Sequence, residues 1–257
     1  MTALRIAIAL PFGLAFGSFL TVVVHRVPRG ESVAHPRSRC PSCGVEVRKI
    51  DNIPVVSWLL LRGRCRACGA RISAIYPLLE LGSGALFVAV VLSVENPWLA
   101  ALESPFAALL VAIAVIDWRT KKIPNAIVYP SLLIWAGAIL AARLAGGEVD
   151  VLRAGLGFLL YGGGLLIVAF IAPRGMGMGD VKLAALIGLV LGAGGLADVA
   201  VAAAAGVLLG GVAAIGALLG GAGRKQGIPY GPFLAAGALT AIFFGRLIAD
   251  AYIRLLT

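Results

Sequence analysis

Eight apolar stretches, each about as long as a membrane-crossing helix, constrain this chain more than any other feature of its sequence. A helix needs about 20 apolar residues to cross a hydrocarbon core of ~30 Å. The chain has 257 residues, of which 60% are hydrophobic and 13% charged, and this composition does not suit a water-facing surface. We therefore predict an all-α polytopic membrane protein with about eight transmembrane helices. The stretches lie at residues 4–24, 76–94, 98–116, 126–144, 153–172, 181–197, 199–220 and 232–255.

Positive charge is concentrated on alternate connections between these stretches. The net charge is +10, and ten of the 22 Lys and Arg residues fall within residues 26–71. Further basic residues lie at 119–122, at Arg174, at Lys182 and at 224–225. Because cytoplasmic loops of membrane proteins carry an excess of Lys and Arg, we predict a cytoplasmic basic side and outward-facing termini. The charge thus indicates membrane topology, and we expect no nucleic-acid partner.

One connection, residues 25–75, is long enough to form a small domain. We therefore expect a first transmembrane helix at 1–24, a cytoplasmic domain at 25–75 and a membrane domain of about seven helices at 76–257. No small-residue cleavage site closes the first apolar stretch before the basic segment, so we expect that helix to be retained.

Pairs of glycines four residues apart recur in the apolar stretches. Such spacing lets two helices approach closely in lipid. We predict this packing for Gly13 with Gly17, Gly206 with Gly210 and Gly216 with Gly220.

All four cysteines lie in the segment 25–75, as Cys40 with Cys43 and Cys65 with Cys68, each pair followed by glycine. Two such CxxC turns are typical of a tetrahedral four-thiolate zinc site, and four thiolates leave no open position for catalysis. We predict a structural Zn²⁺ that holds the small domain together. Two disulfides are the alternative, which a reducing cytoplasm disfavours. An arginine-rich zinc ribbon can also bind nucleic acid, but Trp58 is the only aromatic residue between the pairs.

Three acidic residues lie in or against predicted helices on the basic side: Glu80, Asp117 and Asp180. Asp117 ends the third apolar stretch and Asp180 opens the sixth, so both belong to the same membrane face. Two carboxyl groups that meet can share a proton, one acting as base on water while the other protonates a scissile carbonyl, as in aspartic proteases. The sequence has only two histidines and no GxSxG motif for another hydrolytic mechanism. The ordinary alternatives are a salt-bridged helix end for Asp117 and a helix cap for Asp180.

Together these features resemble the bacterial type IV prepilin peptidases, which are membrane-embedded aspartic proteases of the GxGD type. The resemblance runs in order through nearly the whole chain. The matching segments are GSFLTVVVHRVPRG at 17–30, the two CxxC pairs, YPLLEL at 76–81, DWRTKKIPN at 117–125, GMGDVKL at 177–183 and IPYGPFLAAG at 228–237.

The resemblance implies cleavage of the basic leader of prepilins and pseudopilins at the cytoplasmic face of the inner membrane. It also implies N-methylation of the new terminus with S-adenosylmethionine. By resemblance, Asp117 and Asp180 form the catalytic pair. One departure is Thr21, where the family commonly has Asn, in the amino-terminal part that is linked with methylation.

Further residues are assigned around this expected site. Gly177 and Gly179 would let the substrate backbone approach Asp180 without a side-chain clash. Lys182 is either an interfacial anchor or a partner of the acids, and Glu80 either pairs with an arginine of the domain or contacts substrate or methyl donor. Prolines bracket a turn in IPYGPFLAAG, for which we favour a helix entry that can line the substrate groove.

Two other functions remain open at this point. A different GxGD membrane protease would lack methyltransferase activity, although the cysteine pairs favour the bacterial prepilin type. An ion-coupled transporter would place its acids near the bilayer midplane, whereas these acids are predicted at the interface.

Overall fold

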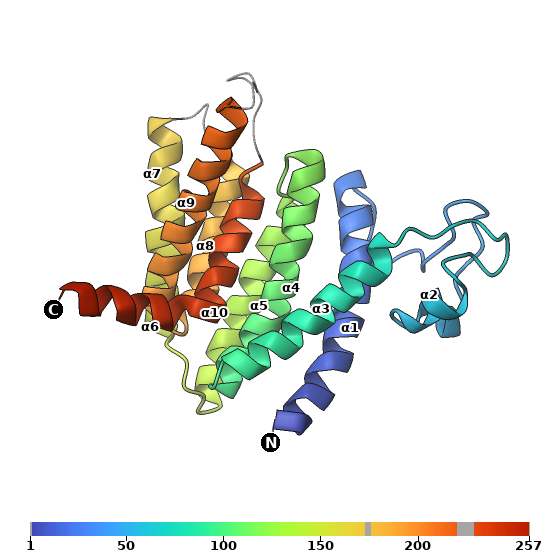
Figure 1. The fold of residues 1–257 in the computed structure, drawn as a ribbon, viewed down its shortest axis with the longest axis horizontal. Coiled ribbons are helices and arrows are strands. Elements are labelled where there is room, and N and C mark those ends of the chain that lie inside the picture. Colours follow the sequence, from blue (N-terminus) through green and yellow to red (C-terminus); the bar gives the residue numbers. More distant parts are fainter. Residues whose placement is uncertain (1, 173–175, 220–228, 257) are drawn as a thin grey trace.

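Helices form nearly all the regular structure of this protein, in a computed structural model that describes residues 2–172, 176–219 and 229–256. Figure 1 shows long helices packed side by side, with the segment between α1 and α3 at one edge of the bundle. Arg174 and the basic residues at 224–225 lie outside the described residues. The long helices are α1 Thr2–Arg26, α3 Ile75–Ser93, α4 Pro97–Thr120, α5 Asn125–Leu144, α9 Leu196–Leu219 and α10 Gly231–Leu256. The shorter elements are η1 Val27–Arg29, η2 Lys49–Asn52, α2 Val56–Leu60, α6 Val151–Gly157, η3 Phe158–Gly162, α7 Gly163–Ile171 and α8 Met178–Gly192.

Seven spans within the described residues are long and apolar enough to cross a membrane. They are α1 with η1, α3, α4, α5, the continuous run α6–η3–α7, α9 and α10. The predicted all-α membrane fold, with the four cysteines between the first two spans, is confirmed.

The remaining predicted stretch, 181–197, differs most from expectation. It corresponds to α8, which begins at Met178 and ends at Gly192, a length of 15 residues or about 22 Å. Leu183, Leu186 and Ile187 have no exposed surface. Because neighbouring helices surround α8, its length need not match the thickness of the lipid.

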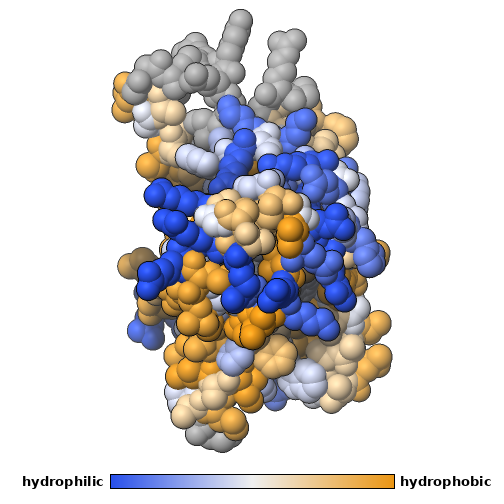
Figure 2. Space-filling view, turned by 90° about the vertical axis from the view of Figure 1, so that its right-hand side faces the viewer, coloured by the Kyte–Doolittle hydropathy of each residue, from blue (hydrophilic) through white to orange (hydrophobic). Residues whose placement is uncertain are grey.

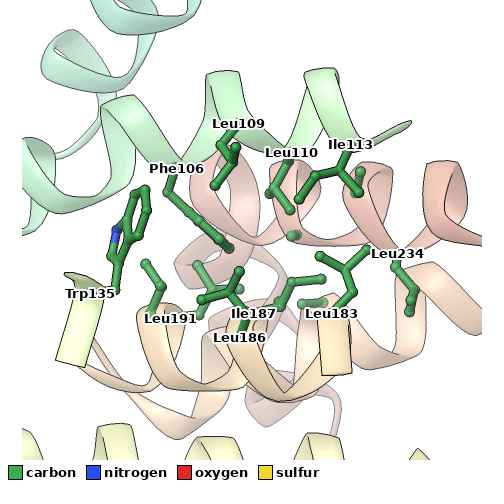
Figure 3. Packing of buried hydrophobic residues seen from close by; sticks show 14 of the residues in the cluster. Phe106, Leu109, Leu110, Ile113, Trp135, Leu183, Leu186, Ile187, Leu191 and Leu234 are labelled. Atoms are coloured by element: carbon green, nitrogen blue, oxygen red, sulfur yellow. The ribbon is translucent and has the colours of Figure 1, made fainter. Parts of the chain in front are cut away.

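The core lies between α4 and α8. Large apolar side chains of the two helices meet there, and Trp135 of α5 donates its indole N–H to the carbonyl of Leu102 at 2.9 Å. Figure 3 shows Phe106, Leu109, Leu110 and Ile113 of α4 opposite Leu183, Leu186, Ile187 and Leu191 of α8. This packing holds the last turn of α4 and the first turn of α8 in a defined relation.

Several predicted glycine contacts are present. A Cβ on Gly13 would lie 2.8 Å from Gly84 Cα, and one on Gly17 would lie 2.8 Å from Glu80 Cα, so α1 and α3 touch through their backbones. A Cβ on Gly210 would meet the Tyr230 ring at 2.5 Å. Gly216, by contrast, has open space among the described atoms, and Gly220 lies outside the described residues.

Candidate active site and metal centre

Asp117 lies in the last turn of α4 and is bound by the start of a distant helix. Its Oδ2 accepts a hydrogen bond of 2.9 Å from the backbone N–H of Gly231, the first residue of α10. The side chain is buried, and the helix ends three residues later at Thr120, followed by Lys121 in a left-handed conformation. The N-terminus of a helix favours an anion, so α10 stabilises negative charge on this carboxyl group.

Asp180 lies in the first turn of α8 and caps its own helix. Its Oδ2 accepts a hydrogen bond of 3.2 Å from the N–H of Gly177. The sequence placed Asp180 at the opening of the helix, whereas α8 begins two residues earlier, at Met178. The helix-capping role, which the sequence offered as the alternative for Asp180, is therefore present. Among the described residues, the second carboxyl oxygen of Asp180 has no hydrogen-bond partner.

The structure brings the two aspartates into one site at the ends of three helices. A Cβ on Gly179 would lie 3.1 Å from Ile123 Cβ, so the start of α8 packs against the connection that follows α4. Asp117 lies in the last turn of α4 and Asp180 in the first turn of α8, so this contact places both carboxyl groups at the same end of the bundle. Tyr230 directly precedes Gly231, whose N–H binds Asp117, so the start of α10 lies at the same place. The ends of α4, α8 and α10 therefore bring two acidic side chains to one part of the molecule.

Gly177 and Gly179 have different surroundings. A Cβ on Gly177 would meet mainly the carboxyl group of Asp180, at 3.2 Å, whereas the corresponding position on Gly179 faces Ile123. A side chain at position 179 would crowd Ile123, so the glycine allows α8 to pack closely on the α4–α5 connection. At Gly177, by contrast, the space beside the backbone is bordered mainly by the Asp180 carboxyl group, so another chain has more room there than at Gly179.

Lys182 is directed toward α5. Its Nζ donates to Asn125 Oδ1 at 3.0 Å and lies 5.0 Å from the centre of the Tyr129 ring. Among the ion pairs of the described chain, none joins Lys182 to Asp117 or Asp180. The lysine therefore links α8 to α5 beside the site.

Glu80 lies in the contact between α3 and the cysteine-bearing segment. Its Oε2 accepts a hydrogen bond of 2.7 Å from the N–H of Val55, and the side chain is buried. Structural pairing was expected with an arginine of the domain, but the partner is a backbone amide. Val55 has a positive φ of 61°, which is uncommon for a β-branched residue, so the bond secures a strained turn.

The four cysteines converge at the edge of the bundle. Their Sγ atoms all lie within 4.8 Å of one another, and Cys40 Sγ is 3.8 Å from Cys68 Sγ. Zn–S bonds of ~2.3 Å in a tetrahedron require sulfur separations of this size, so the donor set fits one metal ion. All four are free thiols, which sets aside the disulfide alternative.

The two CxxC turns have the same backbone geometry. The N–H of Gly44 donates to Cys40 O at 2.9 Å, and the N–H of Gly69 donates to Cys65 O at 2.9 Å. Both glycines have a φ near +70°, in the left-handed region that glycine adopts without strain. This is the physical reason for a glycine after each pair.

The thiol pKa values in this cluster diverge. Backbone N–H groups of Cys43 and Ser42 lower the pKa of the Cys40 thiol to about 6. The pKa of the Cys68 thiol rises to about 11: the Ala70 N–H lowers it, but burial and the other three thiols outweigh that effect. Four thiols this close resist complete ionisation, and a bound cation would remove that resistance.

Gly231 and Tyr230 are site residues that sequence analysis did not single out. The motif IPYGPFLAAG marked a helix entry, and its described part, 229–237, does contain the start of α10. A glycine between two prolines at a helix start was the available signal. Its contact with Asp117, 114 residues earlier, was not readable from the motif.

The fold and the site define a multi-pass membrane protein with paired acids at one end of its bundle and a four-cysteine cluster at the edge. Two family models match it: the bacterial peptidase A24 N-terminal domain at residues 12–94 and the type IV leader peptidase family at residues 105–247. The chain belongs to the type IV leader peptidase family, as the sequence motifs predicted.

Curated relatives extend over almost the whole chain. A prepilin leader peptidase/N-methyltransferase of Burkholderia pseudomallei (strain 1026b) is 38% identical, over 95% of this chain and 87% of the relative. A protein of the same name from Bacillus subtilis (strain 168) is 36% identical, over 95% of this chain and 96% of the relative. The relative from Aeromonas hydrophila is 35% identical over 94% of this chain and 91% of its own length. No solved structure matches the chain.

Proposed function

We propose that this protein is a prepilin leader peptidase that also N-methylates the new terminus, with Asp117 and Asp180 as its catalytic acids. The observation that carries the proposal is that the end of α4 with Asp117, the start of α8 with Asp180 and the start of α10 lie at one end of the bundle, with α10 bound to Asp117 and α8 packed on the α4–α5 connection. Family membership and relatives named for both activities support it. Prepilins and pseudopilins are the proposed substrates, and the lipid bilayer is the surrounding partner.

In the proposed reaction, one ionised carboxylate takes a proton from water, and the water oxygen bonds to the carbonyl carbon at the cleavage site. The other carboxylic acid protonates the carbonyl oxygen. The C–N bond then breaks as the leaving nitrogen receives a proton. Gly177 would admit the substrate backbone beside Asp180, and the Gly231 N–H would orient Asp117.

We propose Zn²⁺ as the metal of the four-cysteine cluster, bound by Cys40, Cys43, Cys65 and Cys68. A filled four-thiolate shell stabilises a fold and provides no hydrolytic centre. S-adenosylmethionine is the proposed methyl donor, in line with the methyltransferase part of the relatives' names. The active site and the cysteine-bearing domain at 25–75 would face the cytoplasm of a bacterial inner membrane, between a first helix at 1–24 and a membrane domain at 76–257.

The decisive experiment compares three matched substitutions on a purified prepilin. Asp117→Asn and Asp180→Asn should each reduce leader removal by roughly 10²- to 10⁴-fold, because each deletes an acid-base group. Asp150→Asn is the control: Asp150 caps α6 at the opposite end of the bundle, and asparagine caps equally well. Full leader removal by either active-site variant would refute the proposed pair. Transfer of a labelled methyl group to processed pilin, assayed separately, tests the second activity.

A further inference from the structure

The short helix α2 lies within the cysteine-bearing segment. It exposes its leucines and buries its serine, which is the opposite of a helix that faces water. Leu60 is 78% exposed and Leu59 is 61% exposed. Ser57, the only polar residue of α2 other than the indole of Trp58, is 6% exposed. A helix that faces water buries its apolar side and exposes its polar side.

The buried Ser57 side chain makes two hydrogen bonds that keep the leucines of α2 on the outside. Its hydroxyl donates to Ile50 O at 2.8 Å and accepts from the N–H of Ile53 at 3.1 Å, so it fastens η2 to α2. Ile50 is 66% exposed and Ile53 is also exposed. The two joined turns therefore expose five large apolar side chains, here called the apolar patch: Ile50, Ile53, Val56, Leu59 and Leu60.

Exposed cations flank the apolar patch. Arg48 and Lys49 precede it in the chain, and Arg62 and Arg64 follow it. The whole segment 25–75 carries ten basic and three acidic side chains. Figure 2 views this side of the molecule and shows apolar surface bordered by hydrophilic surface, with further apolar surface below it. An apolar patch with a basic rim is complementary to the interface of an anionic bilayer.

The chain connections keep the apolar patch beside the membrane. The segment leaves α1 after Arg26 and enters α3 at Ile75, and both helices are membrane spans. Glu80 of α3 also binds Val55, the residue directly before α2, at 2.7 Å. Figure 1 shows the segment lateral to α1 and α3, where lipid would surround the bundle.

We propose that the apolar patch inserts into the headgroup region of the leaflet at this end of the bundle, with the flanking cations on anionic phospholipid. The bilayer is the occupant that the connections favour, because α1 and α3 fix the patch close to its surface. A second copy of the chain or another protein would have to reach the patch at that same lipid boundary. The contact goes beyond the proposed peptidase function and does not depend on it.

Photocrosslinking in the full chain tests this contact directly. Benzoylphenylalanine replaces Leu60 in the metal-loaded protein, reconstituted into phosphatidylcholine vesicles with or without phosphatidylglycerol. The matched control carries the probe at Ala34, an exposed residue of the same segment outside the patch. We expect lipid adducts at position 60 in clear excess over position 34, with a higher yield when phosphatidylglycerol is present.

Two results would overturn the proposal: equal lipid adducts at positions 60 and 34, or adducts at position 60 formed mainly with a second copy of the chain. Metal content is measured for each variant to establish that the cysteine cluster is intact. If the Leu60 variant loses metal, the same probe at Leu59 repeats the test from the neighbouring side chain. None of these measurements uses peptidase activity, so failure of this proposal is distinct from failure of the proposed function.

Discussion

The four-cysteine cluster and the aspartate site are assembled in opposite ways. The cysteines lie within residues 40–68, and each pair is shaped by one local turn with its own glycine. The aspartate site joins α4, α8 and α10, and its groups run from Asp117 to Gly231. Short sequence motifs are therefore enough to form the cysteine cluster, whereas the aspartate site depends on the packing of long helices against one another.

This difference predicts that the two sites fail independently. The segment 25–75 has few buried apolar side chains, so we expect its order to depend on a metal bound by the converging thiols. The aspartate site instead rests on the apolar packing of α4 against α8. Perturbing one source of stability should leave the other region intact.

Metal removal is the largest expected effect. Structural zinc sites contribute on the order of 10 kcal/mol of folding free energy, so a chelator should abolish ordered structure in the segment 38–72. Hydrogen exchange in detergent should show loss of amide protection there and unchanged protection in α4 and α8. Simultaneous loss in both regions would show that they do not fold independently.

Gly231→Ala should selectively damage the aspartate site. The new Cβ would lie 2.8 Å from Asp117 Oδ2, so the carboxyl group must move or α10 must shift. A displacement of this kind can cost roughly 10²-fold in prepilin cleavage, which initial rates on purified protein would measure. Gly163→Ala is the matched control, since a Cβ there meets open space within a helix. Equal rates for both variants would contradict a role for the Gly231 contact.

Glu80 provides a test of the link between the cysteine-bearing segment and the bundle. Glu80→Ala leaves the Val55 N–H without its acceptor and should destabilise the α3 contact by about 1–3 kcal/mol. Faster hydrogen exchange at Val55–Leu60 is the expected readout. Glu80→Gln keeps an acceptor oxygen and should largely restore protection. If glutamine fails to restore it, the negative charge and not the hydrogen bond is what matters.

Thr21→Val should have the smallest effect. The Thr21 hydroxyl donates to Ser18 O of its own helix at 2.7 Å, so it is already satisfied within α1. Valine keeps the branched shape, and we expect a stability change below about 1 kcal/mol. Methyl transfer to processed pilin should stay near the parent level. A large loss of methylation alone would instead place Thr21 at the methyl-donor site.

Much of the architecture was readable from local pattern. Apolar length predicted the membrane spans, because a helix must match the hydrocarbon thickness wherever lipid surrounds it. The rule did not hold for α8, which has only 15 residues and is surrounded by other helices instead of lipid. Local spacing likewise predicted the cysteine cluster, since both CxxC turns close within a few residues. Lys182 and Glu80 show the limit: charge suggested ionic partners, but tertiary packing provides Asn125 for the lysine and the Val55 amide for the glutamate.

The sequence by itself determined the membrane character, the four-thiol cluster and the two candidate acids, because these follow from residue type and short-range spacing. Tertiary structure alone decided what Asp117 contacts and what the start of α8 packs against. Asp117 ends a helix whose own dipole disfavours negative charge, yet the N-terminus of α10, 114 residues away, donates a hydrogen bond to it. Asp180 is held by its own helix start, and Gly179 lets that start rest on Ile123. The contacts of Asp117 with α10 and of Gly179 with Ile123 depend on the packing of whole helices, which no local motif encodes.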